Sequence, residues 1–193
     1  VQAAHRPLRL DEVRHQWLGH RGVVTLVVSA AAIHDQVDHD IPVEPLAVGE
    51  GDLGDSDHGL GVIAIDMQHL QLRFAGAKRP LWVVRNGKLL EFKGTSRSIG
   101  GAYWRQHPFV ETTLQMRPGD SVFMFSDGVS DQFGGPKDRK LKLKGLRTLI
   151  LLLAELPPED QHEFIKTWLT SWQGELPSTD DQLLISFKIP EAS

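Results

Sequence analysis

The sequence predicts an α+β protein in which short antiparallel strands fill the middle of the chain and two helices follow them. Between residues 60 and 125, short apolar or alternating segments recur and are separated by turn signals. The pair Asn86-Gly87 between two such segments is typical of a two-residue hairpin turn. This close spacing favours antiparallel hairpins over parallel strands, which need a long crossover connection.

Each element follows from a local pattern. Strands are expected at 62–66, 70–75, 81–85, 88–92, 109–116, 122–125 and 183–188. Helices are expected at 9–17, 146–156 and 158–174, and 22–33 reads as either a buried strand or a helix. The last helix places Phe164, Ile165, Trp168, Leu169 and Trp172 on one face, which we expect to be buried core. Residues 136–144 carry five Lys or Arg and read as a solvated loop, with a mobile flap as the alternative.

Composition excludes several classes of protein. A chain of 193 residues fits one domain with a substantial core. The net charge of -4 argues against a general nucleic-acid binder, which needs a basic face. There is no cysteine, so thiolate nucleophiles and Cys-ligated metals are excluded, and the composition agrees with the reducing cytoplasm. The longest apolar run, 22–33, is shorter than the roughly 20 residues of a membrane-spanning helix, so no membrane partner is expected.

The first part of the chain differs in composition from the rest. Up to residue 59 it holds six of the nine histidines and no Lys, Phe or Tyr. We therefore expect two units: an atypical N-terminal segment at 1–59, non-native or poorly ordered, and a folded domain at 60–190. Because the chain begins with Val, we expect it to be a piece of a larger protein.

Two patterns in the atypical segment resemble functional sites. Within 34–40, His34 and Asp38 are four residues apart, as are Asp35 and His39, but the two pairs lie on different helix faces. A solvated helix end is therefore favoured there over a metal site. The stretch 54–57 suggests the nucleophile of a serine hydrolase, yet no late Asp-x-x-His pair follows, and we interpret it as a turn.

Carboxylates gather at the ends of two predicted strands. The apolar strand 122–125 runs into Ser126-Asp127-Gly128, and Asp131 comes four residues after Asp127. Asp180 and Asp181 precede the last strand, which an antiparallel sheet could bring beside the first. Converging carboxylates repel unless a hard divalent cation such as Mg²⁺ or Mn²⁺ lies between them. The competing interpretation is that both acidic stretches only cap turns.

Four blocks of the chain, taken in order, carry a family resemblance. They are Phe74-Ala-Gly-Ala-Lys-Arg-Pro-Leu81, Ser98-Ile-Gly100, the stretch from Pro118 to Gly135 that contains Ser126-Asp-Gly-Val-Ser-Asp131, and Thr179-Asp-Asp181. Together they resemble the second half of the SpoIIE-like branch of the PPM-type metal-dependent serine/threonine protein phosphatases, over about residues 60–189. The resemblance implies an α-β-β-α sandwich of two antiparallel sheets flanked by helices, incomplete at its N-terminus.

The resemblance also implies a site. Asp127 and Asp180 would be ligands of a centre with two Mn²⁺ or Mg²⁺ ions, and Asp131 would match the acidic position of a third, weaker ion. Gly128, Asp181 and Gly76 would lie close to this site, and no catalytic residue beyond the metal site is implied. The implied activity is hydrolysis of phosphoserine or phosphothreonine by metal-bound water in bacterial signalling, with an upstream sensor or receiver domain as a further partner.

The sequence departs from the family where the other metal ligands should be. The family's N-terminal metal-binding Asp and its Asp-Gly-His-Gly block are not intact, and Gly19-His-Arg-Gly22 and Asp57-His-Gly59 match only partly. An alternative function is therefore a catalytically inactive or truncated phosphatase-like module that binds a signalling partner.

Overall fold

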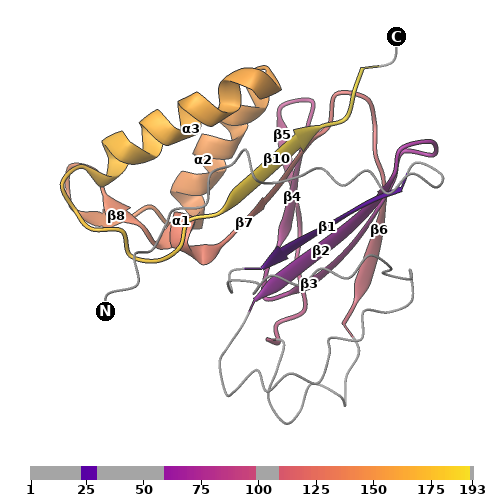
Figure 1. The fold of residues 1–193 in the computed structure, drawn as a ribbon, viewed down its shortest axis with the longest axis horizontal. Coiled ribbons are helices and arrows are strands. Elements are labelled where there is room, and N and C mark those ends of the chain that lie inside the picture. Colours follow the sequence, from indigo (N-terminus) through magenta and orange to yellow (C-terminus); the bar gives the residue numbers. More distant parts are fainter. Residues whose placement is uncertain (1–22, 30–58, 99–108, 192–193) are drawn as a thin grey trace, which may run out of the picture.

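The computed structural model describes residues 23–29, as backbone only, together with residues 59–98 and 109–191. The strands are β1 (Val23–Ser29), β2 (Leu60–Asp66), β3 (Gln71–Ala77), β4 (Leu81–Arg85), β5 (Lys88–Phe92), β6 (Glu111–Gln115), β7 (Ser121–Phe125), β8 (Phe133–Gly134), β9 (Arg139–Lys140) and β10 (Leu184–Lys188). The helices are α1 (Asp127–Asp131), α2 (Lys142–Glu155) and α3 (Pro158–Gln173). Figure 1 shows α2 and α3 gathered on one side of the strands.

Two four-stranded sheets form the centre of the structure. Their strand orders are β1-β2-β3-β6 and β10-β7-β4-β5, and every pairing within them is antiparallel. The predicted α+β class with two antiparallel sheets is thus confirmed. The hairpin between β4 and β5 turns at Asn86 and Gly87, whose φ angles of 50° and 69° are those of the turn that an Asn-Gly pair favours.

The two central strands of the second sheet, β4 and β7, are buried on both faces. Along β4, Leu81 and Val83 join the core cluster that also contains Ile63, Leu72 and Phe74 of the first sheet. The alternate residues, among them Trp82 on β4 and Phe123 on β7, instead pack with Leu146, Leu149 and Ile150 of α2. Because neighbouring side chains of a strand point to opposite faces, two apolar faces require an unbroken apolar run, which is the pattern of 122–125.

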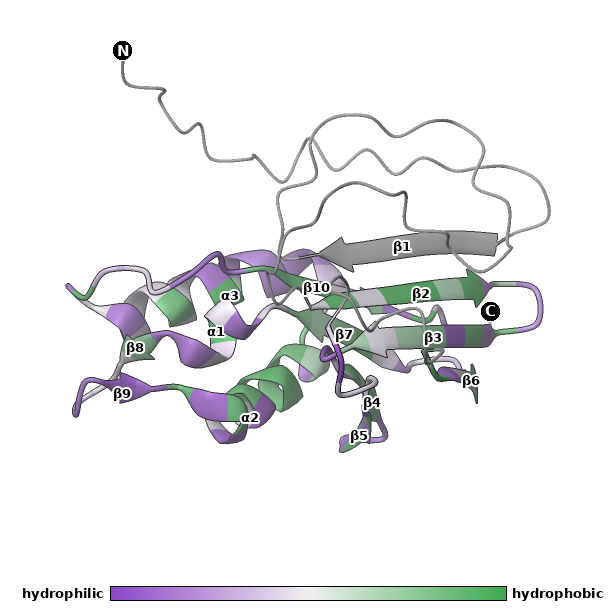
Figure 2. Ribbon diagram, turned by 90° about the horizontal axis from the view of Figure 1, so that it is seen from below, coloured by the Kyte–Doolittle hydropathy of each residue, from purple (hydrophilic) through white to green (hydrophobic). Residues whose placement is uncertain are grey.

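The helical part differs from its prediction at two places. Residues 133–140 form the small hairpin β8–β9, and α2 begins at Lys142, four residues before the predicted start at 146. The apolar face of α3 packs against the helix-side core but stays half-buried, and its one buried residue is Gln161. The hydrophilic hairpin strand β9 contrasts with the largely apolar strands β2 and β10 (Figure 2).

Some predicted features lie outside the described residues. They are the helix 9–17, the polar cluster 34–40, the turn 54–57, and most of the Ser98-Ile-Gly100 block. None of the helices in the described part of the chain is both long and apolar enough to cross a membrane.

An ion pair on the outer side of the first sheet gives a prediction for the effect of pH. Arg73 on β3 donates two hydrogen bonds to Glu111 on β6, at 2.9 and 2.6 Å, and this contact holds the pKa of Glu111 below its usual 4.5. A carboxylate with a lowered folded-state pKa adds stability above the unfolded pKa and loses it as the pH falls through the folded value.

We expect a double-mutant cycle of Arg73→Ala and Glu111→Ala to show a coupling of about 0.5 kcal/mol at pH 7, since both side chains are more than two-fifths exposed. The coupling should be smaller at pH 3 than at pH 7, because a fall in pH through the lowered pKa of Glu111 removes its negative charge. Urea unfolding of the four proteins at both pH values measures it, and an equal coupling at pH 3 would show that the contact is not ionic.

Candidate functional site

The candidate site begins where β7 ends. All five residues of β7 are buried, and the chain leaves the sheet through Ser126, which is extended and stands at the N-terminal end of α1. Asp127 is the first residue of α1, and its carboxylate is about half exposed. Asp127 thus lies just after the end of a strand, with its carboxylate open to solvent.

The buried side chain of Ser126 connects this corner to the start of β10. Its hydroxyl donates a hydrogen bond to the carbonyl of Asp181 at 2.8 Å and accepts one from the amide of Leu183 at 3.0 Å. Its amide also donates to the carbonyl of Leu183 at 2.9 Å. Because buried polar groups are costly to leave unpaired, these three bonds hold the 181–183 backbone beside α1.

Gln132, at the C-terminal end of α1, also connects this helix to the segment that precedes β10. Its side chain is fully buried and donates to the carbonyl of Pro177 at 3.1 Å. The side-chain oxygen Oε1 of Gln132 accepts a hydrogen bond from the amide of Thr179 at 3.2 Å and another from the Gln182 side chain at 2.7 Å. The segment 177–183 is thus held at both ends of the short helix.

Gly128 allows the closest approach between the two acidic stretches. A Cβ atom placed on Gly128 would lie 2.3 Å from the carbonyl oxygen of Asp181 and 3.2 Å from the carbonyl carbon of Asp180. Only a residue without a side chain fits there. The structure therefore brings the backbone at Asp127 and the backbone at Asp180 together, across more than 50 residues of sequence.

Arg79 brings a positive charge to the same place. Its Nη2 lies 3.0 Å from Oδ2 of Asp127, and its side chain is 17% exposed. The guanidinium also lies over Gly59, where an added Cβ would fall 2.4 Å from Nε of Arg79. Gly76, near the end of β3, lies against the backbone of Arg79. A Cβ atom placed on Gly76 would lie 2.3 Å from the carbonyl oxygen of Arg79.

The remaining predicted carboxylates have other contacts. Asp131 is paired with Lys140 of β9 at 2.8 Å. The Asp180 carboxylate accepts a hydrogen bond from the amide of Asp181 at 2.8 Å, and both Asp180 and Asp181 are exposed. Asp131 thus faces the β8–β9 hairpin, whereas Asp180 stays beside α1.

The described residues offer the type of ligand that a divalent cation prefers, but too few of them lie close together to bind one. Carboxylate oxygens are the ligands that Mg²⁺ and Mn²⁺ prefer. Within 59–98 and 109–191, however, no three His, Asp or Glu side chains lie close enough together to hold an ion. The Asp127 and Asp180 pair would need further ligands from residues outside these ranges.

The sequence interpretation missed three residues that build this site: Ser126, Gln132 and Arg79. Ser126 and Arg79 lie inside the blocks that carry the resemblance, so their place beside Asp127 and Gly76 was a usable signal. Gln132 had no such signal, because a buried glutamine cannot be told from an exposed one by its neighbours in the sequence.

Comparison with protein families decides the family. The model of the family described as Stage II sporulation protein E (SpoIIE) matches residues 58–190, more than half of the chain. The chain belongs to the SpoIIE family. The match begins one residue before Gly59 and covers the whole candidate site of this SpoIIE domain. No curated protein matches the chain.

Solved phosphatase domains share the fold. The SiaA-PP2C domain of Pseudomonas aeruginosa is 27% identical with a TM-score of 0.64, over 72% of this chain and 55% of that one. The PP2C phosphatase domain of SpoIIE from Bacillus subtilis, with a fragment of its regulatory domain, is 17% identical with a TM-score of 0.56, over 71% of this chain and 40% of that one. A Bacillus subtilis SpoIIE phosphatase domain presoaked with Mn is 14% identical with a TM-score of 0.51, over 70% and 58%.

These comparisons identify a PP2C-type, phosphatase-like domain of the kind present in regulatory proteins. The chain spans 55% and 40% of the first two solved chains, so it corresponds to about half of each.

Proposed function

We propose that this SpoIIE domain acts as a Mg²⁺- or Mn²⁺-dependent phosphatase on phosphoserine or phosphothreonine of a regulatory protein in the bacterial cytoplasm. The observation that carries the proposal is the close approach at Gly128, which holds Asp127 beside the Asp180 segment. Divalent cations such as Mg²⁺ prefer carboxylate oxygens as ligands, and this corner presents two residues that carry them.

Similarity to solved proteins supports the proposal. The SiaA domain, at 27% identity, is a PP2C domain, and one crystal of the Bacillus subtilis SpoIIE phosphatase domain was presoaked with Mn. The chain covers only 55% and 58% of these two solved chains, so the proposed activity also depends on the geometry of the candidate site.

Each residue at the corner has a role in this proposal. Asp127 and Asp180 would hold the cation, while Ser126 and Gln132 keep the two acidic stretches in register. The guanidinium of Arg79, placed 3.0 Å from Asp127, is suited to bind phosphoryl oxygens in two parallel hydrogen bonds. When bound, the cation supplies Lewis-acid activation of water and neutralises charge on the phosphoryl group.

A second function is favoured by the ion pairs of the site. Arg79 and Lys140 form ion pairs with Asp127 and Asp131, so both carboxylates have a cationic partner from the chain itself. A phosphatase-like module that binds a phosphorylated partner without hydrolysing it would use the same cations to contact the phosphate.

We expect the full chain to hydrolyse p-nitrophenyl phosphate and a phosphoserine peptide with Mn²⁺ or Mg²⁺, and to lose this activity with EDTA. Asp127→Asn and Asp180→Asn should each lower the metal-dependent rate at least about tenfold, because each removes a charged oxygen from the cation. Asp138→Asn, an exposed carboxylate on the β8–β9 turn, is the matched control.

Direct Mn²⁺ binding, measured by electron paramagnetic resonance, separates the two functions. A hydrolytic rate and Mn²⁺ affinity that neither variant changes would place the cation elsewhere. Tight binding of the phosphopeptide without hydrolysis under any metal would establish the binding module instead.

A further inference from the structure

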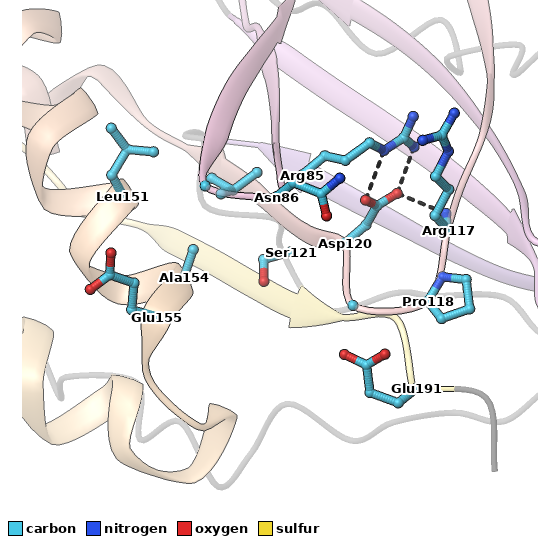
Figure 3. A pocket seen from close by; sticks show the side chains of 13 residues that line it. Arg85, Asn86, Arg117, Pro118, Asp120, Ser121, Leu151, Ala154, Glu155 and Glu191 are labelled. Atoms are coloured by element: carbon cyan, nitrogen blue, oxygen red, sulfur yellow. Dashed lines mark hydrogen bonds and ion pairs between the residues drawn. The ribbon is translucent and has the colours of Figure 1, made fainter.

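A cavity lies at the opposite end of β7 from Asp127. It has a volume of about 460 Å³ and is lined by the β4–β5 turn, the β6–β7 turn, the end of α2 and Glu191, which follows β10. Figure 3 shows Glu155, Ser121 and Glu191 arranged around the same space. None of these residues takes part in the candidate phosphatase site.

The floor of this cavity is rigid and electrically neutral. Asp120 is 1% exposed and accepts two hydrogen bonds from Arg85, at 2.9 and 2.6 Å, and a third from the amide of Arg117 at 2.8 Å. Arg85 and Asp120 satisfy each other, as the dashed lines in Figure 3 show, so neither offers a free charge to a ligand. The charge of the cavity is therefore decided by its other residues.

The position of Glu191 is fixed by the backbone beneath it. The amide of Gly119 donates to the carbonyl of Ile189 at 2.9 Å, and the amide of Ile189 donates to the carbonyl of Asp120 at 2.8 Å. A Cβ atom on Gly119 would lie 2.7 Å from Oε1 of Glu191, so the carboxylate rests directly over this glycine. Gly119 also has a φ of 80°, which disfavours any other residue.

Ser121 provides an independent sign of a ligand. The residue is 2% exposed, yet its hydroxyl makes no hydrogen bond to any described residue. Figure 3 shows this hydroxyl pointing into the space between Glu155 and Glu191. Because this hydroxyl faces the cavity and its hydrogen-bonding capacity is unused, it is available to a polar ligand bound there.

The free charge facing the cavity is negative. Glu155 and Glu191 have no cationic partner among the described residues, and the guanidinium of Arg117 points up beside Arg85 and away from them (Figure 3). Glu155 is also the last residue of α2, which has no basic residue in its last turn. The carbonyl end of a helix carries partial negative charge, so a cation is favoured there and a carboxylate is not.

We propose that this cavity binds an aliphatic ammonium or guanidinium cation. Glu155 and Glu191 contact the charged group, Ser121 accepts one of its hydrogen bonds, and Leu151 and Ala154 pack against the aliphatic chain. The cation belongs either to a free polyamine or to a Lys or Arg side chain of a partner protein, since both present the same group. This inference is independent of the proposed phosphatase activity.

Calorimetric titration of the full chain tests the proposal with two probes, spermidine and the peptide acetyl-Ala-Lys-Ala-Arg-Ala-amide. We expect at least one to bind, and uncharged 1,6-hexanediol not to bind. Glu155→Gln and Glu191→Gln should each weaken binding about fivefold, and the double variant about twentyfold, as expected for partly exposed charge pairs. Tighter binding of spermidine indicates a free amine, and tighter binding of the peptide indicates a partner side chain.

Glu175→Gln, an exposed carboxylate after α3, is the matched control for the change in net charge and should bind as the unmodified chain does. Ser121→Ala should weaken binding about threefold, the loss of one hydrogen bond. Equal affinity of the double variant and the control would overturn the proposal, as would the absence of binding of both probes at millimolar concentration. Thermal unfolding of each variant shows that it is folded.

Discussion

Replacing Gly128 with alanine should destabilise the fold by about 3 kcal/mol, although alanine usually stabilises a helix relative to glycine by about 1 kcal/mol. The reversed sign follows from the contact with Asp181, whose carbonyl oxygen would lie 2.3 Å from the new methyl carbon. Since a backbone carbonyl cannot rotate away as a side chain can, the 180–183 segment must move. Urea unfolding measures the loss of stability.

The same substitution should also reduce Mn²⁺ binding, because it separates Asp127 from Asp180. Gly145→Ala on α2 is the matched control: there the added methyl meets the side chain of Leu141, Cδ1 and Cγ, and not the backbone of another segment. We expect this control to change stability by less than about 1 kcal/mol. A Gly128→Ala protein as stable as its parent would show that α1 and Asp181 are not in contact.

Asp120→Ala should have an effect of similar size, about 3 to 4 kcal/mol, at the other end of β7. The substitution leaves the guanidinium of Arg85, whose side chain is 21% exposed, without its carboxylate, and leaves the amide of Arg117 without an acceptor. Breaking one side of a buried charged pair costs more than removing both sides, because the remaining charge is desolvated and unpaired.

A double-mutant cycle separates this penalty from simple loss of packing. The Arg85→Ala and Asp120→Ala double variant should be more stable than the sum of the two single effects predicts, by about 2 kcal/mol. Glu175→Ala, at an exposed carboxylate after α3, should cost less than about 0.5 kcal/mol. Strict additivity of the two substitutions would contradict the role given to the Arg85 and Asp120 pair.

Much of the sheet could be predicted from local patterns. The unbroken apolar run 122–125 indicates a strand buried on both faces, and β7 is such a strand, with Val122 and Met124 facing the first sheet and Phe123 and Phe125 facing α2. The Asn86-Gly87 turn could also be predicted from the sequence, because few residue pairs adopt two positive φ angles. The position of Asp127 at a strand end followed from the same pattern.

The extent of the helical layer was not predictable in the same way. The apolar face of α3 has the periodicity of a core helix, yet Trp168 and Trp172 stack on each other at 5.7 Å and remain half-buried. Periodicity shows which face of a helix is apolar but not how much of it other elements cover. The start of α2 at Lys142 was hidden by the basic residues there, since charged side chains suit an exposed helix surface as well as a loop.

The sequence alone thus determined the strand pattern, the family blocks and the acidic stretches at 127–131 and 180–181. Only the tertiary structure decided that these two acidic stretches lie side by side, because that depends on groups far apart in the chain. Ser126 forms hydrogen bonds with the backbone of residues 181 and 183, and Gly128 leaves room for that backbone because it has no side chain. Arg79, between β3 and β4, forms an ion pair with Asp127. The contacts of Ser126 and Gly128 depend on the antiparallel pairing of β7 with β10, a register set by packing on both faces and by no local signal.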